Sequence, residues 1–308
     1  MISKIINFFT GENEENKTPE KENNENSKNE TKKIGIYPGC CFQGADEHNY
    51  DLILDFLEKM EVEGVLMEKA ACCGGGVIDE SNKIVTYALN ARNIAIAEQL
   101  GVDLYTPCNT CYMVIAKSKI ALDNNPEMKE KVNKILAEEG LEYKGTATIY
   151  HTLNFLRDFV GLETYKTKIS RPLEGMKVAP YYGCHILSPD EISIDDPENP
   201  TLLKEILEPC GVEIIEGYKD EMTCCGHHSE YTNPKVRKVL ANKPLDGAAE
   251  AGADVLVTPC PLCHKSMDAV GENEPVLQLV QIINVACGIS SEKSHWNINK
   301  NKVRMTFS

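Results

Sequence analysis

The chain has 308 residues, is 42% apolar and carries a formal net charge of -15, so it is long enough for one large or two medium domains with buried cores. Such an acidic body argues against nucleic acid as a partner, because it repels phosphate groups. The sequence shows neither an apolar stretch approaching the ~20 residues that cross a bilayer nor a leader peptide, so we expect a cytoplasmic protein without a transmembrane segment.

Residues 1–33 are expected to form a disordered N-terminal extension. They begin with a short apolar head, but no apolar residue occurs between Phe9 and Ile34. A run of Glu, Asn and Lys of this length cannot bury enough apolar surface to offset the entropy lost on ordering.

An internal repeat begins at Ile34. The first copy has a predicted strand before Gly39 and Cys40, and the second has one before Gly183 and Cys184. A predicted helix follows in each copy, with apolar residues at helical spacing. These residues are Ile53, Phe56, Leu57 and Met60 in the first copy, and Leu203, Ile206, Leu207 and Cys210 in the second.

Each copy then continues with a short strand, a Cys-Cys-Gly turn, a helix such as 83–100, and a strand that ends in Thr-Pro-Cys-x-x-Cys. In the helix at 83–100, Val85, Leu89, Ile96 and Leu100 form the predicted apolar stripe. Alternating strands and helices predict an α/β fold of two lobes with mainly parallel sheets, related by an approximate internal two-fold axis. Each lobe carries one five-cysteine motif.

The predicted first lobe spans residues 34–170 and the second spans residues 171–290. Helical patterns without cysteine within 121–175 are expected to pack across the lobes. A final amphipathic helix is predicted at 276–289, and residues 291–308 form a polar tail.

The cysteines are expected to bind metal, because cytosolic thiols are kept reduced and dense cysteine patterns there indicate metal or redox chemistry. Ten of the 13 cysteines belong to the repeat: Cys40, Cys72, Cys73, Cys108 and Cys111, then Cys184, Cys224, Cys225, Cys260 and Cys263. Five thiolates exceed the four ligands of a tetrahedral zinc ion, whereas an iron–sulfur cluster offers several metal atoms. A zinc-stabilised interaction scaffold without a redox role is the alternative.

Three cysteines lie outside the motif. Cys41 could replace Cys40 as a ligand, but the second copy has His185 at that position, so the shared Gly-Cys alignment favours Cys40. Cys210 and Cys287 are interpreted as small buried apolar residues.

The pattern Cys-x31-Cys-Cys-Gly-x33-Cys-x-x-Cys, repeated as Cys-x39-Cys-Cys-Gly-x33-Cys-x-x-Cys, resembles the duplicated cysteine-rich CCG domain. Among its carriers the chain is similar to the B subunits of methanogen heterodisulfide reductases, over about residues 34–290. The resemblance implies one noncubane [4Fe-4S] cluster in each motif and a catalytic oxidoreductase subunit that reduces the mixed disulfide of coenzyme M and coenzyme B. It also implies electrons from a small ferredoxin-like subunit, in a complex with a flavin-containing subunit, often a flavin-based electron-bifurcating complex with a hydrogenase or formate dehydrogenase.

We expect the substrate disulfide to lie between the lobes, with one cluster facing each sulfur, because its cleavage needs two electrons and clusters deliver electrons singly. No flavin or nucleotide is expected in this chain, since it has neither a Gly-x-x-x-x-Gly-Lys loop nor a Gly-x-Gly-x-x-Gly turn. The alternative is an electron relay, as in the related iron–sulfur subunits of lactate, glycolate or glycerol-3-phosphate oxidising systems or of thiol:fumarate reductase.

Four histidines flank cysteines of the second copy and are candidates for proton delivery: His185, His227, His228 and His264. Their titration range suits this role, although hydrogen bonding that only tunes the site is the alternative. Asn109 and Tyr112 are weaker candidates. The candidate cations for a sulfonate and a phosphate on the substrate are Lys265, Arg92 and Arg237, for which an ordinary solvated charge is the alternative.

Overall fold

The computed structural model describes residues 31–40, 48–272 and 275–303. The predicted N-terminal extension lies outside these residues except for Thr31, Lys32 and Lys33, and Cys41 also lies outside them. Among the described residues, no helix is both long enough and apolar enough to cross a bilayer.

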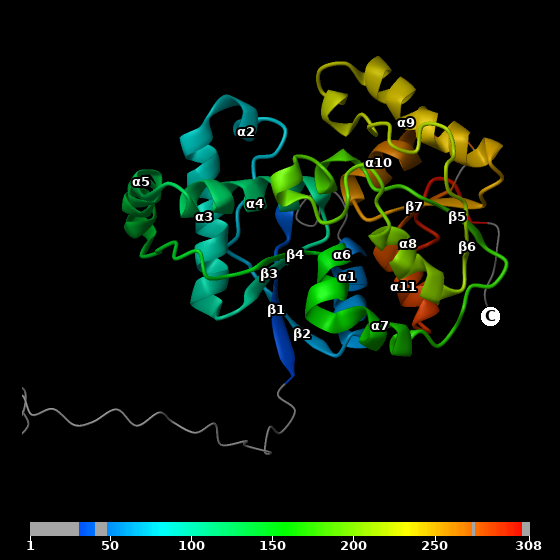
Figure 1. Cartoon of the computed structure of the whole chain (residues 1–308), viewed down its shortest axis with the longest axis horizontal. Helices are drawn as coiled ribbons and strands as arrows, with labels where there is room; N and C mark the ends of the chain where they lie inside the picture. The colour runs from blue at the N-terminus through cyan, green and yellow to red at the C-terminus, as the bar shows by residue number, and fades with distance from the viewer. Residues whose placement is uncertain (1–30, 41–47, 273–274, 304–308) are drawn as a thin grey trace, which may run out of the picture. The chain divides into compact units, whose positions relative to one another are not determined.

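Four parallel strands form the first sheet, in the order β2-β1-β3-β4 (Figure 1). Their bounds are β1 Lys32–Ile36, β2 Val62–Leu66, β3 Asp103–Thr106 and β4 Ile149–His151. Ile34 and Ile36 on the inner strand β1 are fully buried. Burial of a strand on both faces is typical of a parallel sheet that is covered by helices.

The second sheet repeats this arrangement in the order β6-β5-β7-β8, again with all strands parallel. Its strands are β5 Lys177–Pro180, β6 Glu213–Ile214, β7 Val255–Thr258 and β8 Val276–Gln278. The identical strand order confirms the predicted fold class, two α/β lobes with parallel sheets built from one repeated unit.

The helices of the first lobe are α1 His48–Lys59, α2 Ile78–Ser81, α3 Lys83–Leu100, α4 Asn109–Asp123, α5 Pro126–Leu136, α6 Thr152–Asn154 and α7 Leu162–Lys168, with a π-helical segment at Phe155–Gly161. Those of the second lobe are α8 Leu202–Leu207, α9 Pro234–Glu250, α10 Pro261–Val270 and α11 Leu279–Ala286. Four helices of the first lobe, α1, α3, α4 and α6, have the same place in the strand order as α8, α9, α10 and α11 of the second. Asn82 and Asn233 cap α3 and α9 in the same way, since each side chain accepts a backbone hydrogen bond from the third residue on.

Helix α3 has the predicted bounds, but its buried face differs from the predicted stripe. Ile96 of that stripe is buried as predicted, but Val85 is 41% exposed and Leu100 is 47% exposed. The buried face instead includes the small residues Ala91 and Ala95, and α3 packs against α4 and α5. A stripe drawn through large apolar residues misses such packing, because close helix contacts favour small side chains.

The predicted helix at 276–289 was wrong in its first turn. Residues Val276–Gln278 form strand β8, and α11 begins only at Leu279. All eight residues of α11 are buried, including the polar residues Gln281 and Asn284 on its less apolar side. Strand β4, in the segment 121–175, was also missed. A short buried strand cannot be distinguished from a buried helix by the spacing of apolar residues, which explains both errors.

The two lobes exchange helix contacts. Helix α1 of the first lobe packs on α11 of the second, and Asn284 Nδ2 donates a 3.0 Å hydrogen bond to the carbonyl of Leu52. Conversely, Tyr165 of α7 donates a 2.8 Å hydrogen bond to the carbonyl of Ile206 in α8. The described residues from Lys32 onward therefore form one compact unit, and the buried cysteines of both motifs belong to one continuous core.

Candidate metal centre

The Thr-Pro-Cys segments place one cysteine of each motif at the carboxyl end of an inner strand. The backbone N–H of Cys108 donates to Thr106 Oγ1, and the N–H of Cys260 donates to Thr258 Oγ1, both at 3.4 Å. Ligands of open α/β sheets bind at this edge, where the loops after the strands converge.

The Cys-Cys-Gly turns are also equivalent. The N–H of Gly74 donates to Cys72 Sγ and that of Gly226 donates to Cys224 Sγ, each at 3.4 Å. Both glycines have φ in the left-handed region, 79° and 72°, which other residues adopt only with strain. Glycine is therefore required where the turn aims its N–H at sulfur.

A tyrosine after the first strand of each lobe fixes the approach to the turn. Tyr37 donates a 2.7 Å hydrogen bond to the carbonyl of Ala71, and Tyr181 donates a bond of the same length to the carbonyl of Thr223. Both rings are fully buried. This support was not recognised in the sequence, although each tyrosine directly follows the repeated strand.

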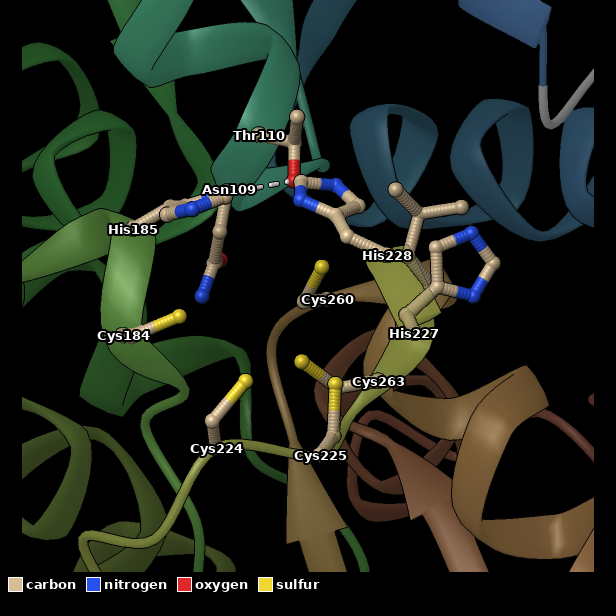
Figure 2. A pocket seen from close by; sticks show the side chains of 11 residues that line it. Asn109, Thr110, Cys184, His185, Cys224, Cys225, His227, His228, Cys260 and Cys263 are labelled. Atoms are coloured by element: carbon tan, nitrogen blue, oxygen red, sulfur yellow. Dashed lines mark hydrogen bonds between the residues drawn. The ribbon is translucent and has the colours of Figure 1, made fainter. Parts of the chain in front are cut away.

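The five sulfur atoms of the second motif point into the same space (Figure 2). Together they line a cavity of about 40 Å³ that opens to solvent. Cys184 and Cys224 are exposed, whereas Cys225, Cys260 and Cys263 are buried, so the sulfurs span the wall from its open rim to its closed interior.

The first motif has the same distribution. Cys40 and Cys72 are exposed and the other three cysteines are buried, with Cys73 and Cys111 Sγ atoms 3.5 Å apart. Within the described ranges, no three His, Cys, Asp or Glu side chains are arranged to hold a single metal ion.

Each Cys-Cys-Gly turn contains two adjacent cysteines, and hydrogen bonds from neighbouring thiols favour ionisation of the first of them. The contact with Cys40 lowers the pKa of Cys72 to about 2, and the contact with Cys184 lowers the pKa of Cys224 to about 2. Contacts with neighbouring thiols and burial hold the pKa of Cys111 and Cys263 well above the usual range. Several buried thiolates are stable together only beside positive charge, which a metal centre supplies. This donor set fits a polynuclear iron–sulfur cluster.

The two motifs lie next to each other. The thiols of Cys108 and Cys260 are in hydrogen-bonding contact across the lobes; burial, and then this contact, raises the pKa of Cys260. Asn109 and Thr110, the middle residues of the first Cys-x-x-Cys, line the cavity of the second motif. The lobes therefore bring the two cysteine sets to a common region.

Three of the four predicted histidines line the same cavity (Figure 2). The ring centroid of His228 lies 5.0 Å from that of His185 and 5.8 Å from that of His227. Burial, followed by the charge of His228, lowers the pKa of both His185 and His227. The fourth, His264, is buried on α10 and is not among the residues that line the cavity.

The three predicted cations lie in different places. Arg92 pairs with Glu139 at 2.8 Å and lines a separate groove between α3 and α5. Arg237 on α9 pairs with Glu230, which precedes that helix. Lys265 is exposed, and its positive charge contributes to the lowered pKa of His227. Of the three predicted cations, it is therefore the one with an electrostatic effect on a histidine that lines the cavity.

His151 is a buried residue at the site that the sequence analysis missed. It is fully buried at the end of β4, and burial lowers its pKa to about 4. Its Nδ1 accepts a 3.3 Å hydrogen bond from the N–H of Leu153, and the Cys108 thiol is near enough to influence it. The only available signal was the short strand β4, which itself was not predicted.

Cys210 and Cys287 are buried apolar residues, as predicted. They are 0% and 2% exposed, and burial raises their pKa to about 12 and about 11, respectively.

Comparisons with known proteins identify the same repeat. The profile of the cysteine-rich domain family, CCG, matches residues 34–116 and 178–268. The B subunit of the ferredoxin/F420H2-dependent CoB-CoM heterodisulfide reductase of Methanosarcina acetivorans is 37% identical over 275 residues, 85% of this chain and 91% of that protein. The membrane anchor subunit of the 8-methylmenaquinol:fumarate reductase of Wolinella succinogenes is 29% identical over 279 residues, 87% of this chain and 96% of that protein.

A solved structure has the same fold. The crystal structure of a hypothetical protein from Helicobacter pylori aligns with a TM-score of 0.72 over 89% of this chain. This chain covers only 53% of that protein, and the sequence identity is 17%, so the likeness concerns the fold alone.

Proposed function

This chain belongs to the cysteine-rich CCG domain family together with the B subunits of heterodisulfide reductases, and we propose that it is the catalytic iron–sulfur subunit of such a reductase. The proposed reaction is reduction of the mixed disulfide of coenzyme M and coenzyme B to the two thiols. The observation that carries the proposal is the contact between two complete five-cysteine motifs in one chain.

Each motif would hold one noncubane [4Fe-4S] cluster. Its ligands would be Cys40, Cys72, Cys73, Cys108 and Cys111 in the first lobe and Cys184, Cys224, Cys225, Cys260 and Cys263 in the second. Bound clusters would supply electrons singly, and a disulfide needs two. Adjacent motifs suit that requirement, because both can act on one substrate without a mobile carrier between them.

The side chains around the second motif would bind the substrate and supply protons. Thr110 Oγ1 forms a 2.9 Å hydrogen bond with Nδ1 of His185. The other ring nitrogen, Nε2, would therefore be the atom that transfers a proton. His227 and His228 line the same cavity. Lys265, which is exposed, would attract an anionic group of the substrate.

The proposed partners are a ferredoxin-like subunit as the electron donor and a flavin-containing subunit, in a larger complex with a hydrogenase or formate dehydrogenase. Similarity to the B subunit of a heterodisulfide reductase over 85% of this chain supports an assembly of several subunits. A role in methanogenesis and a cytoplasmic location stay predictions.

A second candidate function is an electron relay without disulfide chemistry. The similarity to one of the subunits of a fumarate reductase favours it. In that case the motifs would pass electrons to an acceptor elsewhere in the complex, and the cavity beside the second motif would bind no disulfide.

Turnover of anaerobically purified, cluster-loaded protein separates the two functions. With a reduced artificial donor and the mixed disulfide of coenzyme M and coenzyme B, we expect formation of both thiols. Full iron and sulfide content without thiol formation would favour the relay. Colourless protein with about one zinc per motif would overturn both proposals.

A further inference from the structure

The two middle residues of the first Cys-x-x-Cys face the second motif. Asn109 is 2% exposed, and its Nδ2 donates a 2.7 Å hydrogen bond to the carbonyl of Tyr182, 73 residues away. Tyr182 immediately precedes Gly183 and Cys184 in the sequence. Asn109 therefore holds the turn that presents the first cysteine of the other motif.

The contact at this turn is close. Gly183 has φ of +75°, and a Cβ added there would lie 3.0 Å from Asn109 Nδ2 and 3.0 Å from Cys263 Sγ. Only glycine lets the backbone pass between the carboxamide and the sulfur. A movement of Asn109 would thus be transmitted to Cys184 and Cys263.

The other end of the carboxamide has no hydrogen-bond partner. Asn109 Oδ1 is buried and unpaired among the described residues, while Asn109 lines the cavity. The bond from Nδ2 to Tyr182 fixes which end is oxygen. Because Asn109 lines the cavity, this oxygen can accept a hydrogen bond from an N–H, O–H or S–H group of a bound molecule.

Thr110 makes a second connection of the same kind. Its Oγ1 lies 2.9 Å from His185 Nδ1, and its methyl group packs against the first Cys-Cys-Gly turn, since a Cβ on Gly75 would meet it at 2.6 Å. One residue of the first motif thereby sets the direction of a histidine of the second.

The second Cys-x-x-Cys has no residues that could form equivalent hydrogen bonds to the first motif. The corresponding residues of the second Cys-x-x-Cys are Pro261 and Leu262. Neither side chain can form a hydrogen bond. Asn109 and Thr110 therefore make the surroundings of the second motif polar, and the second Cys-x-x-Cys cannot do the same for the first.

We propose that Asn109 and Thr110 are positioning residues for the second motif: Asn109 holds the turn of Cys184 and offers Oδ1 to a donor group of the ligand, and Thr110 orients His185. The identity of the ligand that carries this donor group rests on the function proposed above. The effect on the second motif itself does not depend on that function.

The test compares two buried asparagines. Asn109→Ala and Asn284→Ala each remove a hydrogen bond from an Asn side chain to a carbonyl of the other lobe, but Asn284 contacts Leu52 in α1. Paramagnetic resonance spectra are recorded on cluster-loaded full-length protein in two backgrounds, Cys73→Ala to disable the first motif and Cys225→Ala to disable the second.

We expect Asn109→Ala to change the spectrum when only the second motif is intact and to leave it unchanged when only the first is intact. Asn284→Ala should change neither spectrum. A change confined to the first motif, or identical spectra for both asparagine variants, would overturn the proposal.

Thr110 provides a readout that does not need these backgrounds. Thr110→Val keeps the shape of the side chain and removes the hydroxyl, so kcat should fall roughly fivefold, the scale of one hydrogen bond, with the iron content unchanged. Thr110→Ser should restore kcat. Equal losses in both variants would contradict the assignment.

Failure of the proposed function gives a different result. If native protein fails to reduce the mixed disulfide but Asn109→Ala still changes the spectrum of the second motif, the function is wrong and the positioning role stands.

Discussion

The two five-cysteine motifs have the same backbone support and different surroundings. In both, a threonine fixes the Thr-Pro-Cys segment, a tyrosine fixes the Cys-Cys turn, and a glycine N–H is directed at sulfur. The second motif additionally lies beside three histidines of its own lobe. It also lies beside Asn109 and Thr110, two polar residues of the first lobe. Duplication thus preserved the groups that would hold a cluster, while the three histidines that line the cavity lie only around the second motif among the described residues.

Even shared supports can use different residues. The carbonyl of Cys73 accepts a 3.0 Å hydrogen bond from Asn90 on α3, whereas the carbonyl of Cys225 accepts a 2.8 Å bond from Ser266 on α10. The backbone geometry is the common feature, and the side chain that supports it can come from either neighbouring helix.

The largest expected effect is the loss of one motif. Cys73→Ala and Cys225→Ala should each remove about half of the iron and sulfide and abolish disulfide reduction, because each removes a buried ligand from one cluster. Metal analysis and turnover measure this. Native iron content in either variant would show that the affected motif holds no cluster.

His185→Gln should lower turnover by roughly a hundredfold with unchanged iron content, since general acid catalysis typically contributes at least this much. His264→Gln is the comparison, because His264 is buried outside the cavity and should have a smaller effect. Steady-state kinetics measures the turnover of both variants. Equal losses of turnover would contradict a proton-transfer role for His185.

The two turn glycines should differ in tolerance. Alanine in the left-handed region costs about 1–2 kcal/mol at either site. Gly226→Ala should cost more than Gly74→Ala, because its Cβ would lie 3.0 Å from the Cα of Arg237, whereas that of Gly74 would meet the side chain of Ile78 at 3.0 Å. Denaturant unfolding of the two variants, with the native chain as reference, measures the difference, and the reverse order would contradict it.

The smallest effect is expected at a core position outside the motifs. Cys210 takes the place that Met60 has in the first copy, and both are buried. Cys210→Ala should cost about 1 kcal/mol, comparable to the loss of one buried heavy atom, and leave the iron content unchanged. Loss of iron in this variant would mean that Cys210 belongs to the site.

Most of the fold could be predicted because it is encoded locally. The repeated helices around Phe56 and Ile206 show their apolar spacing within a few residues, and the Cys-Cys-Gly and Thr-Pro-Cys-x-x-Cys segments recur in the same order. Strands β4 and β8 escaped prediction because each has only three residues and continues directly into a helix. Periodicity cannot separate such a short buried strand from the helix that follows it.

The sequence by itself determined the duplication, the parallel α/β lobes and the two sets of five cysteines, because each of these is a pattern of residue types at fixed spacing. Only the tertiary structure decided that Cys108 meets Cys260, that Asn109 reaches Tyr182, and that His151 is buried beside them. Such contacts join residues about 40 to 150 positions apart and depend on how the elements pack, which no local spacing records.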